Sequence, residues 1–193
     1  MRHWHTFKET MNHEMEDVDI NLSKKGYKLD GRQGIKLSIK VNQYKSVDYI
    51  ADDVSLSLVE FSDLYRDQHR VNNTLQEVLD SNITEDSVNM IKRTLESQVQ
   101  KDLVSKFKDS ISIIIQMQKI NFCDELSHYT ENNSRKSIKY IIVIAPFHPS
   151  IPNNKRGELA RVISQLKNNV TSGLPQAINA RANVILLDEY ARQ

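Results

Sequence analysis

Residues 140–145 read YIIVIA, a continuous run of apolar and mostly β-branched residues that ends at Pro146. Strands of parallel sheets are covered on both faces and have this kind of unbroken apolar sequence. Residues 183–188, NVILLD, form a second such run. Between the two runs, apolar residues recur at helical spacing at positions 159, 162, 163 and 166. The pattern predicts two parallel strands joined by a helix that ends near Gly173.

Upstream of this unit, residues 46–129 contain two long apolar stripes at helical spacing. The first begins at Ser46, which suits an N-cap, and ends at Asp80. The second begins at Thr84 and runs to about Tyr129. Each helix would be about 50 Å long at 1.5 Å per residue. Because the connection between them is short, the sequence predicts an antiparallel helical hairpin.

Two helices of this length offer more apolar surface than a small sheet can cover. We therefore expect part of this surface to meet another chain, in a homo-oligomer or with a protein partner. The residues predicted for that interface are Val54, Leu58, Phe61, Leu95, Val99, Leu103 and Phe107.

Near the N-terminus, residues 18–22 and 35–41 alternate apolar and polar side chains, which is typical of strands with one buried face. Turn residues occupy the stretch between them, so a β-hairpin is predicted. Residues 1–16 lack a clear period and are predicted to form an arm. The predicted fold is α+β, with this hairpin and the β-α-β unit in a small mixed sheet. Residues 17–193 would be a single domain from which the helical hairpin (46–129) can project.

The predicted β-hairpin is basic. Asp30 is the only acidic residue between Lys24 and Lys45. A basic ribbon with interleaved tyrosines suits contact with nucleic-acid phosphates or with an acidic protein partner. The residues predicted for this contact are Lys24, Lys25, Lys28, Arg32, Lys36 and Lys40.

The loop 146–158, PFHPSIPNNKRGE, follows a predicted buried strand and precedes a helix. Ligands of α/β sheets bind beyond the carboxyl ends of strands, so this loop is a candidate ligand site. Its candidate residues are His148, Asn154, Lys155 and Arg156. Three prolines within seven residues also suit a stiff structural or partner-contact loop.

The remaining features narrow the class of protein. The chain has 193 residues, a formal net charge of +1 and one cysteine, Cys123, so neither an intramolecular disulfide nor a cysteine-based zinc cage is expected. No catalytic motif, cofactor motif or metal-ligand cluster is found. Without a signal peptide or an apolar run long enough for a membrane span, the expected location is the cytoplasm, or that of an infected host cell. The abundance of Asn, Lys, Ile and Ser would follow from an AT-rich genome, as in many phages, mobile elements and some bacteria, and a phage or mobile element is the expected origin.

Three functions are compatible with these observations. The first is a non-enzymatic interaction, scaffold or assembly protein that oligomerises or joins a larger complex through the helical hairpin. The second is a nucleic-acid-binding protein that uses the basic 24–45 segment. The third is an enzyme with its site in the 146–158 loop.

Overall fold

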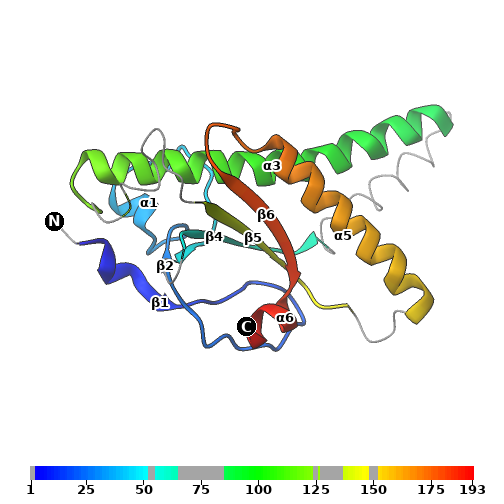
Figure 1. Cartoon of the computed structure of the whole chain (residues 1–193), viewed down its shortest axis with the longest axis horizontal. Coiled ribbons are helices and arrows are strands. Elements are labelled where there is room, and N and C mark those ends of the chain that lie inside the picture. Colours follow the sequence, from blue (N-terminus) through cyan, green and yellow to red (C-terminus); the bar gives the residue numbers. More distant parts are fainter. Residues whose placement is uncertain (1–2, 52–54, 65–84, 124–125, 127–136, 148–151) are drawn as a thin grey trace.

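A computed structural model of the chain describes residues 3–51, 55–64, 85–123, 126, 137–147 and 152–193 (Figure 1). The fold is α+β, with a mixed six-stranded sheet in the order β1-β2-β3-β4-β5-β6. The strands are β1 (Lys8–Thr10), β2 (Lys25–Lys28), β3 (Tyr49–Ala51), β4 (Ser57–Ser62), β5 (Ile138–Ile144) and β6 (Ala180–Leu186). The helices are η1 (Trp4–Phe7), α1 (Ile35–Ser38), α3 (Glu85–Lys119), α5 (Asn153–Gly173) and α6 (Leu187–Arg192).

The sheet changes from antiparallel to parallel at β4. The pairs β1–β2, β2–β3 and β3–β4 are antiparallel. The pairs β4–β5 and β5–β6 are parallel. Helix α3 lies in the chain between β4 and β5, and α5 between β5 and β6. The predicted parallel β-α-β unit, β5-α5-β6, is therefore confirmed.

Helices α3 and α5 cover one face of the sheet, and the larger hydrophobic core lies beneath them (Figure 1). Alternate strand residues such as Leu58, Tyr140 and Ile142 point to this face and pack against Phe107 of α3 and Val170 of α5. This face is apolar because a long helix packs on it, except at the polar positions described below. Among the described helices, none has the length together with the apolar run that crossing a bilayer requires.

The N-terminal segment and α6 cover the opposite face. The intervening strand residues, including Val59 and Val143, meet Met11, Met15 and Tyr190 there. Trp4 is fully buried in the larger core, and β1 pairs with β2. Residues 3–16, predicted as an arm, thus supply strand pairing and core side chains.

The predicted hairpin between residues 18–22 and 35–41 is not found. Residues 18–22 have no regular secondary structure, and Ile35–Ser38 form the short helix α1. Lys40 then takes a positive φ of 61°. The alternating apolar residues at 35–41 do not share one buried face, because the short helix and the turn after it bury Ile35 while Leu37 stays 46% exposed.

The first helix of the predicted hairpin is wrong over residues 46–51 and 55–62, and its remaining part, residues 65–80, lies outside the described residues. Residues 46–51 and 55–62 contain β3 and β4 instead, and the described residues beyond them end at Leu64. Strand β4 is covered on both faces, so Leu58, Val59 and Glu60 are all buried. When both faces of a strand are buried, apolar residues no longer alternate, and their spacing can imitate a helix. The second helix is confirmed as α3 and ends at Lys119, before Asn121 with its positive φ of 52°.

Gly34 provides a stability test of the segment that leads to β3. A Cβ at Gly34 would lie 2.6 Å from the carbonyl oxygen of Leu29, so Gly34→Ala should destabilise the fold by about 2 kcal/mol or more. In α5, a Cβ at Gly157 meets nothing within 4 Å. Gly157→Ala should therefore stabilise the chain by up to about 1 kcal/mol. Urea denaturation of both variants measures this difference, and equal effects would contradict the packing around Gly34.

Candidate functional site

Two carboxylates face each other across β3 and β4. The ladder pairs Tyr49 with Val59 and Ile50 with Leu58, so Asp48, one residue before β3, comes opposite Glu60. Side chains two residues apart in a strand share a face, and Glu60 therefore lies on the Leu58 side, beneath α3. Like charges directly opposite each other destabilise a sheet. Their presence here makes this pair a candidate functional site.

Glu60 is the more deeply buried of the two, with 2% of its surface exposed. Its Oε1 accepts a hydrogen bond from Lys106 Nζ at 2.6 Å. Its Oε2 is buried and has no hydrogen-bond partner among the described residues. Burial, and next the negative charge of Asp48, raise the pKa of Glu60 from 4.5 to about 8, although Lys106 opposes this. A carboxylate with one unsatisfied oxygen is costly to bury unless another group binds it.

Asp48 is less deeply buried than Glu60, with intermediate exposure. Its Oδ2 accepts the backbone N–H of Phe61 at 2.7 Å, which fixes the carboxylate beside the end of β4. Burial raises the pKa of Asp48 from 3.8 to about 6, and the hydrogen bond from Phe61 and the charge of Lys106 oppose this increase. Asp48 is thus easier to ionise than Glu60.

Lys106 comes from the middle of α3 and supplies the positive charge of the site. Burial lowers its pKa, but the charges of Glu60 and Asp48 outweigh burial, so the pKa is raised and the amine is protonated. One turn earlier on α3, Asp102 forms an ion pair with Lys45. On the other side of Asp48, Asp30 pairs with Lys36 at 2.5 Å. The site therefore has two further ion pairs near it, one between α3 and Lys45 and one in the segment before β3.

This arrangement joins two oxygen ligands to a fixed ammonium group. Carboxylates suit a hard cation such as Mg²⁺, which takes one or two protein carboxylates and completes its shell with water and substrate phosphate. Within the described ranges, no three His, Cys, Asp or Glu side chains converge on a metal position. Water and substrate would therefore have to fill the other positions, as Mg²⁺ commonly allows.

The predicted basic contact residues are spread over β2, α1 and the turns around them. Lys28 pairs with Glu9 at 3.0 Å, and Lys24 lies over the ring of Tyr190. Lys36 is held by Asp30. The remaining predicted cations, Lys25, Arg32 and Lys40, are exposed.

The predicted interface residues lie largely in the chain's own interior. Leu58, Leu103 and Phe107 are buried in the larger core, against which Val99 is also packed. Phe61 packs against the smaller core on the opposite face. Val54 and the side chain of Leu95 lie outside the described residues.

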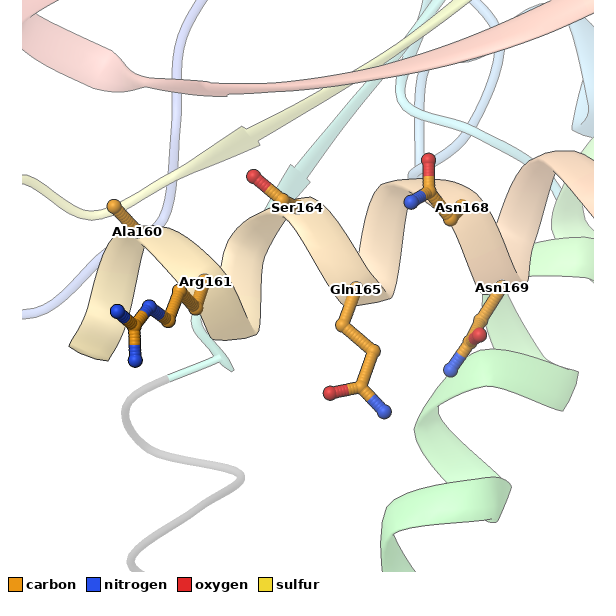
Figure 2. A pocket seen from close by; sticks show the side chains of 6 residues that line it. All are labelled: Ala160, Arg161, Ser164, Gln165, Asn168 and Asn169. Atoms are coloured by element: carbon orange, nitrogen blue, oxygen red, sulfur yellow. The ribbon is translucent and has the colours of Figure 1, made fainter. Parts of the chain in front are cut away.

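The candidate ligand loop is only partly described. His148 and the side chain of Asn154 lie outside the described residues, and Lys155 and Arg156 are exposed in the first turn of α5. Farther along α5, a surface depression is lined by this one helix, with Arg161 and Gln165 extending from it (Figure 2). Its lining has neither a nucleophile–base pair nor a buried charge. It therefore offers weaker chemistry than the Asp48, Glu60 and Lys106 site.

Comparison of the chain with models of known protein families, with curated proteins and with solved structures gives no match. Function must therefore be argued from the chemistry of the site itself.

The raised pKa values predict an unusual dependence of stability on pH. Between 4.5 and about 8 the folded chain binds a proton at Glu60 that the unfolded chain has lost, so stability falls as pH rises through this window. The pKa of Asp48 is raised from 3.8 to about 6, so Asp48 adds to the loss of stability between these two pH values. We expect the wild type, free of divalent cations, to lose on the order of a few kcal/mol of unfolding free energy between pH 5 and pH 8.

Urea denaturation of Glu60→Gln should show a much smaller loss over the same range, because the amide does not titrate. Glu189→Gln, which changes an exposed carboxylate of α6, is the matched control and should behave as the wild type. Equal pH profiles for the wild type and Glu60→Gln would show that Glu60 has an ordinary pKa.

Proposed function

We propose that the chain is a divalent-cation-dependent phosphodiesterase that acts on nucleic acid. Asp48 and Glu60 bind the cation, and Lys106 contacts the phosphate. The observation that carries this proposal is the buried, unpartnered Oε2 of Glu60, opposite Asp48 and beside Lys106. A bound cation supplies the missing partner and removes the repulsion between the two carboxylates.

A divalent cation at this position would polarise a phosphate oxygen and lower the pKa of bound water. The chain's own groups hold the two carboxylates in place. The N–H of Phe61 holds Asp48 in one orientation, and the two strands hold Glu60 opposite it. Because these groups are fixed before substrate arrives, no free energy is lost in ordering them during the reaction.

Lys106 donates its hydrogen bond to Glu60 Oε1 when no cation is present. Once a cation binds Glu60, the ammonium group can donate hydrogen bonds to a phosphate oxygen instead. A protonated lysine at this place stabilises the negative charge that develops on the phosphate during attack by water. Its raised pKa keeps the group charged at neutral pH.

Exposed cations favour nucleic acid as the substrate class. Arg32 and Lys40 lie on the segment that leads to Asp48, and both are exposed. A polymer of phosphates can contact several such cations at once, whereas a small phosphate ester cannot. Binding should therefore weaken steeply with salt.

Cleavage of single- and double-stranded DNA and RNA with Mg²⁺ or Mn²⁺ tests the proposal. Asp48→Asn, Glu60→Gln and Lys106→Ala should each lower kcat by roughly 100-fold or more, since each removes a group that acts on the reacting phosphate. Lys108→Ala, an exposed lysine of the same helix, should lower kcat less than about threefold. Cleavage that survives chelation of divalent cations, or that is unchanged in Glu60→Gln, would exclude this site as its source.

The assembly function predicted from the sequence is a second candidate, and it stays a prediction. Its support is the length of α3, about 50 Å, whose N-terminal end extends beyond the sheet (Figure 1). Multi-angle light scattering should then give a mass above that of the 22.3 kDa chain, before and after nuclease treatment. A monomer at micromolar concentration would contradict self-assembly and leave the phosphodiesterase proposal unaffected.

A further inference from the structure

A single buried hydroxyl connects the two halves of the candidate site. Ser110 lies on α3, one turn after Lys106, and is 0% exposed. Its Oγ donates a hydrogen bond to the carbonyl oxygen of Lys106 at 2.6 Å. The same atom accepts the backbone N–H of Val47 at 3.0 Å. One atom thus bridges the backbone of Lys106 to the residue that precedes Asp48.

Neighbouring contacts hold the same segment. The backbone N–H of Lys45 donates to Asp109 Oδ2 at 3.0 Å, and the Lys45 side chain forms its ion pair with Asp102. In an extended segment, the N–H groups of residues two apart point to the same side. Lys45 and Val47 accordingly both donate their backbone N–H groups to side chains of α3.

We propose that Ser110 is a positioning residue that sets Asp48 at its working distance from Glu60 and Lys106. This inference rests on the proposed phosphodiesterase function and names the residue that aligns its site. Ser110 does not touch the cation or the phosphate. It acts through the backbone of Val47, whose next residue carries the carboxylate, and through the turn of α3 that carries the lysine.

The role requires a group that donates and accepts at once. A serine hydroxyl does both, whereas alanine does neither and would leave the Val47 N–H buried without a partner. A thiol has nearly the same shape but is a weak donor and acceptor. Threonine keeps the hydroxyl. Ser112 makes a similar bond to the carbonyl of Lys108 at 3.1 Å and, among the described residues, has no hydrogen bond to a second segment. It is the matched control.

Steady-state cleavage of DNA or RNA with Mg²⁺ tests the inference, with kcat and KM measured separately. Ser110→Ala and Ser110→Cys should lower kcat between about 10-fold and 100-fold while KM changes less than about threefold, because the reacting groups are misaligned and the exposed cations still bind the strand. Ser110→Thr should restore kcat to within about threefold of the wild type, and Ser112→Ala should match the wild type.

Hydrogen exchange of the Val47 amide supplies a readout independent of activity. It should speed up in Ser110→Cys and stay slow in Ser112→Ala. Thermal unfolding identifies variants that fail to fold, and Ser110→Cys keeps the test decisive if Ser110→Ala does not fold. An active wild type with wild-type kcat in Ser110→Cys would overturn the positioning role alone. An inactive wild type would overturn the phosphodiesterase proposal itself.

Discussion

The contact between Glu60 and Lys106 is the constraint on which the polar part of this fold depends. Glu60 lies on a central strand, under a helix, where the neighbouring positions are apolar. Burying a carboxyl group there is unfavourable unless a partner binds it, and removing the lysine alone would leave Glu60 Oε1 without its hydrogen-bond donor. The register of α3 on the sheet is therefore fixed by this contact as well as by the packing of Phe107 and Ile114.

Helix α3 both fills the core and carries polar residues of the candidate site. Its apolar residues fill the core, and Tyr140 of β5 anchors it by donating a hydrogen bond to the carbonyl of Leu103 at 3.0 Å. Between these apolar residues, Asp102, Lys106 and Ser110 recur at four-residue steps and so share one side of the helix. That side meets the segment from Lys45 to Asp48 and the end of β4. A rigid element is well suited to hold reacting groups.

The parts of the fold whose periodicity is unambiguous could be predicted from the sequence. The run YIIVIA, the helix after it and NVILLD correspond to β5, α5 and β6, and the second apolar stripe corresponds to α3. The prediction of a helix failed over residues 46–51 and 55–62, because a strand covered on both faces shows no alternation of apolar and polar residues. There the spacing of Val47, Ile50 and Leu58 fits a helix as well as it fits the strands β3 and β4. Tertiary burial, which a single sequence does not display, decided between them.

Because a helix was predicted from residue 46 onward, the candidate site could not be predicted from the sequence. Read as helix, Asp48 and Glu60 are two ordinary charges on a solvated surface, and Lys106 is one of many lysines. Read as paired strands, Asp48 and Glu60 become opposite neighbours, and α3 then brings Lys106, 46 residues away from Glu60, to the same place. One signal was present in the sequence: Glu60 interrupts the apolar run LSLVEF at 56–61. A charged residue inside a segment that must be buried is rarely placed there by packing alone. Such an interruption therefore indicates a buried functional group as soon as the segment is recognised as a strand.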